Sequence, residues 1–343
     1  MSRVLVVATS RKTRGGITSV VKAHESGEQW KLFHCHWVQT HRDGPTWRKI
    51  IYFIGAFLDY GIRLPFYDII HLHISQPTTI LRKSAFLNLA KLFRKKIIVH
   101  FHAFNVEDTI KGQYSNKYIE FFSKANRVIV LSNWWKHELT NAGVTANLIN
   151  VLYNPCPRVI TYNDSRGNII LYAGTVNQRK GYADLIRAFA KINTMYPDWI
   201  LEIAGNGKIE QGKNLCRELG IADNVRFLGW LENKEKEAAF NRASIFCLPS
   251  YAEGFPMAVL DAWAYGLPVI TTPVGGIPDI ATDGKNILLF NPGDIDKLAE
   301  QLERMISDEM LRTQISRQSE ILAKTTFNQD TINQQLADLY ASL

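Results

Sequence analysis

The alternation of short apolar runs with longer amphipathic stretches limits the fold of this chain more than any other feature. The amphipathic stretches, such as residues 183–196 and 235–244, separate runs that are rich in β-branched residues. This pattern predicts parallel sheets that are covered by helices on both faces. The runs predicted to be strands are residues 4–9, 69–74, 96–102, 127–132, 148–153, 168–174, 199–205, 225–229, 244–250, 267–272 and 287–290.

A turn-rich segment at residues 153–168 divides these runs into two series, and a chain of 343 residues is long enough for two cores. We therefore expect an α/β fold with two doubly wound, Rossmann-like domains at residues 1–158 and 159–327, joined by a linker near 155–165. The helical stretch at about 328–343 could cross back to the first domain. Doubly wound sheets bind ligands beyond the carboxyl ends of their strands, so a ligand is expected in the cleft between the domains.

Charge is divided unevenly between the two halves of the chain. Residues 1–158 contain 22 Lys and Arg against 9 Asp and Glu, and the remainder contains 18 against 23, so the balances of +13 and −5 sum to the net +8. The basic half favours an anionic partner, which could be a membrane, a phosphorylated substrate or nucleic acid. Nucleic acid is the weakest of these because no RNA- or DNA-binding motif is present in the sequence.

Two stretches of the basic half, residues 46–67 and 78–97, mix apolar side chains with cations, as interfacial helices do. One hypothesis is that they attach the protein to an anionic membrane that presents a glycan acceptor. The alternative is that their apolar faces pack on the sheet while their cations face water. The cations that the first hypothesis assigns to the membrane surface are Lys83, Arg94, Lys95 and Lys96.

No apolar run is long enough to span a bilayer, and the first residues are typical of a strand, not of a signal peptide. We expect a cytoplasmic protein, with peripheral attachment to the inner face of the membrane left open. The four cysteines lack metal-binding spacing and fit reduced thiols, and the pair His34 and His36 has no third ligand nearby. No metal site is therefore expected. His71 and His73 should lie on one face of their strand.

The stretch EGFPMAVLDAWAYGLPVITT begins at Glu253 and carries an acid where a buried helix is expected. Pro256 can begin this helix and Gly266 can end it, and the residues between them are apolar on every side except at Asp261. A buried carboxylate needs donors, which a structural arginine or a pair of ligand hydroxyls could supply. The N–H groups of the first helical turn suit a diphosphate, and Glu253 could reach a polar group beyond it. A nucleotide sugar has this layout of diol, diphosphate and polyhydroxylated group.

Three earlier segments follow predicted strands and could face the same ligand. Arg179 and Lys180 stand where a strand gives way to a helix, which makes an anion-binding corner unless both are simply solvated loop cations. The Gly-x-Gly turn at residues 205–207 is a weak signal by itself, and a tight turn that needs positive φ explains it better. At Trp230 and Leu231 a base could meet backbone groups, or the side chains could pack in the core.

The segment at residues 249–280 resembles the signature of the family-4 retaining glycosyltransferases, which have the GT-B fold. These enzymes carry a Glu, seven further residues and a second Glu, followed by a Gly-Gly turn. Here Glu253 and Asp261 occupy the acidic positions and Gly275-Gly276 the turn. The resemblance extends through AGTVNQRKG, AGNG and FLG, and so covers nearly the whole C-terminal domain.

The same resemblance is weaker in the N-terminal domain, where an early glycine pair and a strand-ending histidine match. It implies that Glu253 holds hydroxyls of the donor sugar, Asp261 the ribose diol, and His102 the reacting sugar. The catalytic positions that it implies are Glu253, His102, Arg179 and Lys180. The substrate-binding positions are Gly15, Gly16, Thr175, Asn206, Gly207, Trp230, Leu231, Gly254, Phe255, Pro256, Met257 and Asp261.

Two positions depart from the family pattern. Thr175 stands where the family has an arginine, so that Arg179 would have to compensate at the diphosphate. Asp261 is one methylene shorter than glutamate, so that the ribose would have to lie closer.

The resemblance implies a retaining, metal-independent hexosyltransferase without a cofactor. It would move a sugar from a nucleotide-diphosphate sugar to a glycan or lipid-pyrophosphate-linked acceptor in bacterial surface polysaccharide biosynthesis. Cations and helix amides directed at the leaving diphosphate would stabilise the transition state. The resemblance suggests front-face attack, in which a donor phosphate oxygen helps to take the acceptor proton. The alternatives are a GT-B nucleotide-sugar epimerase and a non-catalytic nucleotide-binding scaffold.

Overall fold

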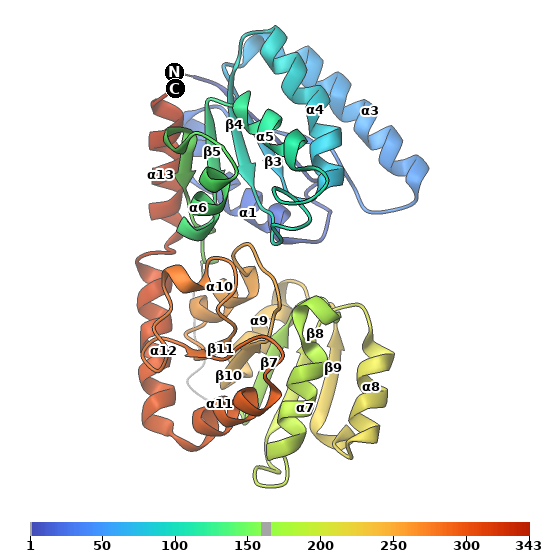
Figure 1. Cartoon of the computed structure of the whole chain (residues 1–343), viewed down its shortest axis with the longest axis vertical. Coiled ribbons are helices and arrows are strands. Elements are labelled where there is room, and N and C mark those ends of the chain that lie inside the picture. The colour runs from blue at the N-terminus through green and yellow to red at the C-terminus, as the bar shows by residue number, and fades with distance from the viewer. Residues whose placement is uncertain (1, 159–165) are drawn as a thin grey trace. The chain divides into compact units, whose positions relative to one another are not determined.

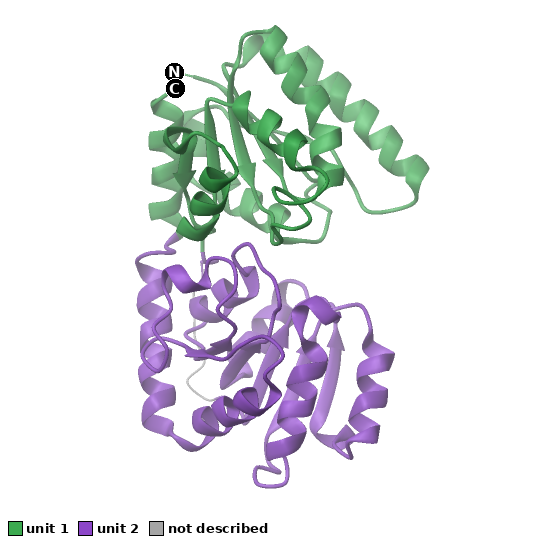
Figure 2. Ribbon diagram, in the orientation of Figure 1, with its two compact units in different colours: residues 1–155, 329–343 green, residues 156–328 purple. Residues whose placement is uncertain are grey.

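The computed structural model describes residues 2–158 and 166–343, and the chain divides into two compact units (Figures 1 and 2). Unit 1 consists of residues 1–155 and 329–343, and unit 2 consists of residues 156–328. Each unit contains a six-stranded parallel sheet with flanking helices. The predicted architecture of two doubly wound α/β sheets is therefore confirmed.

The linker that the sequence predicts near residues 155–165 overlaps residues 159–165, which lie outside the described residues. The expected boundary between residues 158 and 159 adjoins the same segment. The described chain resumes at Arg166, shortly before the first strand of unit 2.

The sheet of unit 1 has the strand order β2-β1-β3-β4-β5-β6. Its strands are β1 (Val4–Ala8), β2 (His36–Gln39), β3 (Ile69–Ile74), β4 (Lys96–Phe101), β5 (Arg127–Val130) and β6 (Ile149–Val151). Its helices are α1 (Gly16–Glu25), α2 (Glu28–Leu32), α3 (Thr46–Arg63), α4 (Pro77–Leu92), α5 (Ser115–Ser123), α6 (Asn133–Asn141) and α13 (Gln329–Ala341).

The two faces of this sheet carry different cores. One face packs against α3 to α6 through aromatic side chains such as Tyr60, Phe86 and Phe122. The other face packs against α1 and α13, and α13 supplies Leu336 and Tyr340 to that core. The last helix of the chain is thus an integral part of the first compact unit, since it covers apolar sheet surface that would otherwise face water.

The sheet of unit 2 has the strand order β12-β11-β10-β7-β8-β9. Its strands are β7 (Ile169–Ala173), β8 (Ile200–Ala204), β9 (Val225–Gly229), β10 (Ile245–Leu248), β11 (Val269–Thr271) and β12 (Leu288–Leu289). Its helices are α7 (Tyr182–Ile192), α8 (Ile209–Glu218), α9 (Asn233–Arg242), α10 (Met257–Ala264), α11 (Ile295–Ser307) and α12 (Glu309–Lys324). The loops that could bind a ligand leave its carboxyl edge.

Every run that the sequence predicts to be a strand contains one, usually shortened by a residue or more at its ends. The sequence missed β2, whose residues His36–Gln39 are only partly apolar. This strand lies at the edge of the sheet and pairs with β1 alone among the described strands. An edge strand of four residues produces too weak a periodic pattern to be recognised in the sequence.

Lys83 does not lie on the surface, where the membrane hypothesis placed it. Its side chain is buried, and Nζ donates to the carbonyl oxygen of Val7 at 2.7 Å and to Oγ1 of Thr40 at 2.8 Å. Burial, followed by the nearby charge of Arg82, lowers the pKa of Lys83 well below its ordinary value. Lys83 therefore joins α4 to the strands beneath it. Among the described residues, no helix has both the length and the apolar character needed to cross a membrane.

We predict that Leu336→Ala destabilises the full chain by about 2–5 kcal/mol, because it leaves a cavity under α13. Leu336 is fully buried, whereas the neighbouring Gln335 is exposed. Urea-induced unfolding followed by circular dichroism measures the effect, with Gln335→Ala as the matched control on the same helix. Equal midpoints for the two variants would show that α13 does not contribute to the core of unit 1.

Candidate functional site

The loops that follow β7 and β10 lie side by side at the carboxyl edge of the unit 2 sheet. The two strands are neighbours, and the N–H of Tyr251 donates to the carbonyl oxygen of Arg179 at 2.7 Å. Gly181 permits this approach: its φ is +68°, and a Cβ atom there would lie 2.0 Å from the carbonyl oxygen of Pro249. Backbone packing therefore brings the predicted cationic loop and the predicted acidic loop together.

Glu253 is the centre of a charged cluster between these loops. Its Oε1 accepts hydrogen bonds from Lys180 Nζ at 2.5 Å and from Ser250 Oγ at 2.6 Å. Arg179 Nη1 lies 3.5 Å from Glu253 Oε2 and donates to the carbonyl oxygen of Ala252 at 2.7 Å. The sequence analysis assigned Arg179 and Lys180 to the diphosphate and Glu253 to hydroxyls of the sugar. The structure shows that these cations also form ion pairs with Glu253. The alternative of freely solvated cations is wrong for Lys180, whose side chain is only 13% exposed.

The electrostatic environment keeps Glu253 ionised. Burial by itself would raise the pKa of its carboxyl group, since a dry interior disfavours charge. The charges of Lys180 and Arg179, together with the hydrogen bonds from Lys180 and Ser250, outweigh this effect and lower the pKa below its ordinary value. The carboxylate is therefore a hydrogen-bond acceptor at neutral pH.

A glycine turn supports the segment between Glu253 and α10. Gly275 has a φ of +60°, and a Cβ atom there would lie 2.2 Å from the carbonyl oxygen of Glu253. The N–H of Gly276 donates to the carbonyl oxygen of Gly254 at 2.8 Å. Only a glycine at position 275 allows this close packing, which explains the first residue of the Gly-Gly pair physically.

The buried helix predicted after Pro256 is confirmed as α10. Pro256 is its N-cap, and the helix carries fully buried Leu260 and Trp263. Phe255, just before the helix, is also buried, while Met257 is partly exposed. The first turn of α10 thus follows the Glu253 cluster directly, with the N–H groups that a helix start leaves without intrahelical partners.

Asp261 lies one turn into α10 and forms an ion pair with a residue that the sequence analysis did not consider. Lys236 Nζ of α9 lies 2.7 Å from Asp261 Oδ2. The sequence analysis suggested an arginine as the protein donor to this carboxylate, and the structure has a lysine in that role. The Lys236 side chain is 39% exposed, so this pair is far more accessible to water than the Glu253 cluster.

The loops after β7, β8 and β9 are joined by backbone hydrogen bonds. The N–H of Val176 donates to the carbonyl oxygen of Asn206 at 2.7 Å, and that of Gly205 donates to the carbonyl oxygen of Gly229 at 2.7 Å. A Cβ atom at Gly205 would lie 1.8 Å from the carbonyl oxygen of Gly174, so this glycine is required by packing. The explanation of Gly205 and Gly207 as positive-φ turn residues is confirmed.

Five predicted ligand contacts lie at the ends of these joined loops. Thr175, Asn206 and Gly207 are exposed. Trp230 is 36% exposed, and its Nε1–H donates to Glu232 Oε1 at 2.8 Å, so the alternative of core packing is wrong for this residue. Leu231 is half-buried.

Three predicted site residues belong to unit 1. Gly15 is the N-cap of α1 with a φ of +139°, and Gly16 is the first residue of the helix; both are exposed. A Cβ atom at Gly15 would meet open space, so its backbone conformation, not crowding, calls for glycine. His102 follows β4 directly and is half-buried, in agreement with its prediction as a strand-ending histidine.

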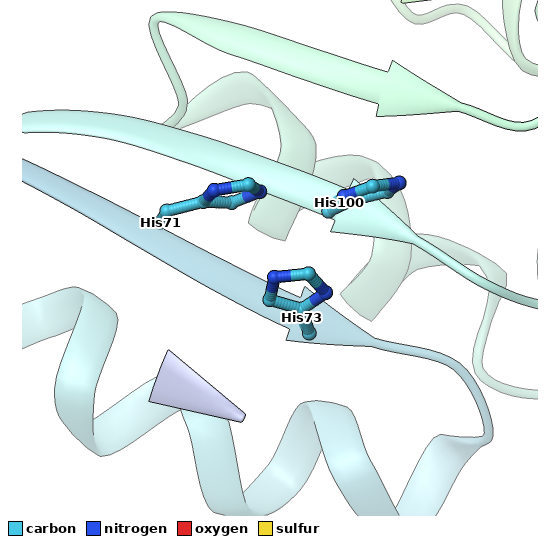
Figure 3. Close-up of side chains that lie close together, drawn as sticks. All are labelled: His71, His73 and His100. Atoms are coloured by element: carbon cyan, nitrogen blue, oxygen red, sulfur yellow. The ribbon is translucent and has the colours of Figure 1, made fainter. Parts of the chain in front are cut away.

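A group of buried histidines lies beside His102 on the same sheet face (Figure 3). His71 and His73 of β3 stack at 4.5 Å between ring centroids, which confirms that they share a face. His100 of β4 stacks nearly parallel to His71, with an angle of 8° between the rings.

One ring nitrogen from each of His71, His73 and His100 lies within 4.8 Å of the other two, which raises the question of a metal. Imidazole nitrogens that share one zinc ion lie about 3.4 Å apart, since each Zn–N bond is about 2.1 Å. The rings are stacked, so their in-plane lone pairs do not converge on one point. This arrangement is that of packed neutral imidazoles and not of a metal centre.

Sequence reasoning did not predict the contacts that Ser250, Lys236 and His73 make. Ser250 lies inside the segment that carries the resemblance, but a serine there has no spacing that marks it as a donor. Lys236 belongs to the charged run NKEKEAAF, where a lysine is usually solvated. Only the packing of α9 beside α10 gives it a carboxylate partner.

We predict that Lys180→Met destabilises the protein by about 3 kcal/mol near neutral pH, because it leaves the Glu253 carboxylate buried with fewer donors. The folded-state pKa of Glu253 is lowered, so the pair stabilises the protein above the ordinary pKa of 4.5 and loses this effect as pH falls through the folded pKa. The difference between wild type and variant should therefore shrink below about pH 4.5.

Urea unfolding at several pH values measures this difference. The matched control is Lys213→Met, which removes an exposed lysine paired with Glu210 on α8 and should change stability little. A difference that stays constant from neutral to acidic pH would show that Lys180 contributes by packing and not by charge.

Sequence models of two protein families match the chain in succession. Glycosyltransferase Family 4 matches residues 13–157, and Glycosyl transferases group 1 matches residues 158–321. An uncharacterized glycosyltransferase of Haemophilus influenzae is 26% identical over 244 residues, which are 69% of this chain and 67% of the relative. A lipopolysaccharide 1,6-galactosyltransferase of Salmonella typhimurium is 31% identical over 204 residues, which are 57% of this chain and only 56% of the relative.

Among solved structures, HepE of Anabaena in complex with UDP-glucose aligns with a TM-score of 0.79. The alignment covers 100% of both chains at 19% identity, which shows a shared fold. That fold is the GT-B arrangement that the sequence resemblance implied. Taken with the two matching family models, these findings show that the chain belongs to the family-4, group 1 glycosyltransferases.

Proposed function

We propose that the protein is a retaining glycosyltransferase whose unit 2 binds a nucleotide-diphosphate sugar. The observation that carries this proposal is the buried Glu253 cluster. It lies just before the first turn of α10, and Asp261 follows one turn further along that helix. Acid, cations and helix start are thus neighbours in one unit. HepE binds UDP-glucose on the same fold, which supports this class of donor.

The charges of the cluster suit a diphosphate leaving group. Arg179 and Lys180 contribute two positive charges against the single negative charge of Glu253, and the α10 N-terminus adds about half a positive charge. When the sugar–phosphate bond breaks, negative charge collects on the diphosphate, and these groups stabilise it more than they stabilise the intact donor. The family has an arginine at the position of Thr175, and in this proposal Arg179 supplies that positive charge instead.

The role of Glu253 in this proposal follows from its ionisation. An ionised carboxylate accepts hydrogen bonds, so it would hold hydroxyls of the donor sugar. Lys180 and Ser250 fix its position through Oε1, which leaves Oε2, with Arg179 at 3.5 Å, as the oxygen for the sugar. Asp261 would receive the ribose diol, in exchange for part of its ion pair with Lys236.

The remaining site residues keep the roles that the resemblance implies. Gly15 and Gly16 would let the phosphates approach the start of α1, and His102 would contact the donor sugar. Backbone groups at Trp230 and Leu231 would meet the base. In the proposed mechanism the acceptor attacks from the face that the diphosphate leaves, and a phosphate oxygen takes its proton, so the reaction retains configuration and requires no metal ion.

The acceptor side of the proposal rests on the outer face of α3. One side of this helix packs inward through Ala56 and Tyr60, and its other side exposes apolar residues at helical spacing. Those residues are Trp47, Ile50, Ile51, Ile54, Leu58 and Ile62, which are 52–73% exposed. We call them the α3 stripe.

Exposed cations accompany the α3 stripe at Arg48 and Lys49 on the same helix, and at Lys91, Arg94 and Lys96 around the end of α4. An apolar stripe with cations beside it matches an anionic bilayer surface. We propose that this face attaches the protein to the cytoplasmic side of a membrane, where a lipid-pyrophosphate-linked glycan would be the acceptor. The similarity to a lipopolysaccharide galactosyltransferase favours a surface polysaccharide as the product class.

We predict that UDP-, GDP-, ADP- and dTDP-sugars include a donor that raises the melting temperature, and that Glu253→Gln lowers kcat for its transfer about 100-fold or more. The amide cannot accept charge-assisted hydrogen bonds as the carboxylate does. Circular dichroism checks folding, and Glu210→Gln, at an exposed carboxylate of α8, is the control. Wild-type turnover by Glu253→Gln would refute the site.

Product analysis in the same assays separates the alternatives. Release of an isomeric nucleotide sugar or free sugar without an acceptor would indicate an epimerase. Tight nucleotide binding without turnover across a wide acceptor panel would indicate a scaffold.

We also predict that replacing Ile50, Ile54 and Leu58 together by serine reduces binding to phosphatidylglycerol-containing vesicles at least tenfold, because about 1.5 kcal/mol or more is lost per apolar side chain. These side chains are exposed, so folding should persist. Vesicle co-sedimentation measures the effect. A matched control replaces three exposed apolar residues of unit 2, Met195, Met310 and Ile321, by serine.

Unchanged vesicle binding in the α3 variant would contradict the membrane role. Loss of a wild-type dimer in size-exclusion chromatography, without vesicle binding, would assign the α3 stripe to self-association instead.

A further inference from the structure

The half-buried His102 is hydrogen-bonded to a second histidine that neither the family resemblance nor the proposed function uses. His73 Nδ1 lies 2.9 Å from His102 Nε2. The two residues come from neighbouring segments, since β3 carries His73 and His102 follows β4 directly. His73 is buried, and its other nitrogen, Nε2, has no hydrogen-bond partner among the described residues.

Both rings are neutral at physiological pH. Burial, together with the neighbouring histidines, lowers the pKa of His73 well below its ordinary value. Burial lowers the pKa of His102 to about 3. A neutral imidazole has one N–H and one bare nitrogen, so the pair shares two protons and forms one hydrogen bond.

Only two proton arrangements are compatible with the 2.9 Å contact. In the first, His73 Nδ1–H donates to His102 Nε2, which leaves a bare nitrogen at His73 Nε2 and an N–H at His102 Nδ1. In the second, His102 Nε2–H donates to His73 Nδ1, which leaves the second proton on His73 Nε2, buried without an acceptor. Orphaned buried N–H groups are rare and destabilising.

The outer nitrogen of His102 is in a different environment. His102 is half-buried, and its Nδ1 is absent from the buried polar atoms that lack partners in the described part of the chain. This nitrogen therefore reaches solvent, where water or a ligand can accept its proton. The first arrangement satisfies both protons, and the second leaves one buried and unpaired.

We propose that His73 is a positioning residue that fixes His102 in the tautomer with a proton on Nδ1, so that His102 donates a hydrogen bond to an oxygen of the donor substrate. This inference rests on the proposed function for the identity of the substrate. It deepens that function because it specifies the direction of the hydrogen bond: His102 meets an acceptor oxygen of the sugar or phosphate.

The surrounding histidines hold the pair in this orientation. His73 stacks on His71 at 4.5 Å and lies 4.8 Å from His100, and His102 stacks on His100 at 4.1 Å between ring centroids. A ring enclosed between two others cannot flip without moving them. Figure 3 shows the three buried members of this group on β3 and β4.

A neighbouring histidine shows that the packing also determines tautomers elsewhere on this face. His24 Nδ1 of α1 lies 2.8 Å from Oδ1 of Asn333 of α13. That oxygen also accepts from Gln29 Nε2 at 2.9 Å, so it is an acceptor and His24 carries its proton on Nδ1. The bare Nε2 of His24 is buried and has no partner among the described residues, as is true of the bare Nε2 of His73 in the proposed arrangement.

The first test is the tautomer of His102 in the full-length wild-type protein, from the nitrogen chemical shifts in a long-range proton–nitrogen NMR spectrum of 15N-histidine-labelled protein. The signals of His102 are those that disappear in His102→Gln. We expect a protonated Nδ1 and a bare Nε2. The opposite pattern overturns the proposal, and this readout needs neither substrate nor activity.

The second test compares His73→Phe with His73→Asn. Phenylalanine keeps an aromatic ring for stacking but removes the donor, and the amide N–H of asparagine can replace Nδ1–H. In His73→Phe the Nε2 atom of His102 has no partner, so we expect its ring to lose the single fixed tautomer and to show a mixture of both, with kcat lowered about tenfold or more. In His73→Asn, the wild-type tautomer and most of kcat should be retained.

The outcomes separate the positioning role of His73 from the proposed glycosyltransferase function. If His73→Phe folds with an unchanged His102 tautomer and unchanged kcat, the positioning role is wrong. If His73→Asn loses as much activity as His73→Phe while both remain folded, the effect is structural and the proposal is also overturned. If the wild type transfers no sugar, the proposed function and the substrate contact fail, while the NMR spectrum still decides whether His73 determines the tautomer.

Discussion

The hydrogen-bonded ion pair between Lys180 and Glu253 is the interaction on which the rest of unit 2 depends. It joins loops whose residues are 73 positions apart in the chain, and it places a charged carboxylate in a site that is almost closed to water. Such a carboxylate is tolerated only when several donors reach it, so the backbone must bring those donors together. The close contacts of Gly181 and Gly275 do so, because each permits an approach that a Cβ atom would block.

Unit 1 has the same kind of sheet as unit 2, but the polar groups that it buries include several imidazoles instead of an ion pair. One face of its sheet is apolar in the usual way, and the other carries a row of imidazoles beneath α1 and α13. Neutral imidazoles stack like other aromatic rings, but each also carries one donor and one acceptor that need partners. Tyr340 of α13 supplies one such partner to His71 at 2.7 Å, so the last helix contributes polar contacts as well as apolar cover. The packing of this face therefore supplies hydrogen-bond partners to His24, His71 and His73 and not merely a shape.

Helix α3 of unit 1 has two apolar sides, one that packs inward and one that is exposed. The inward side of α3 contains Phe53 and Phe57, which meet Phe86 of α4 edge to face. The outward α3 stripe is exposed and is too extensive for a chance scatter of apolar residues. The cations predicted for this surface differ in exposure. Arg94 and Lys96 are exposed, whereas Lys83 is buried and hydrogen-bonded inside unit 1.

The fold class, nearly all the strands, the buried helix α10 and the acidic segment at Glu253 could be predicted from the sequence. These features depend on local periodicity, on turn chemistry and on a motif that is continuous in the chain. The sequence could not reveal β2, whose pattern is too short, or the burial of Lys83. The ion pair of Lys236 with Asp261 and the hydrogen bond between His73 and His102 are visible only in the folded chain. Those contacts join separate helices and strands, and side-chain partners across such distances depend on packing, which spacing along the chain does not encode.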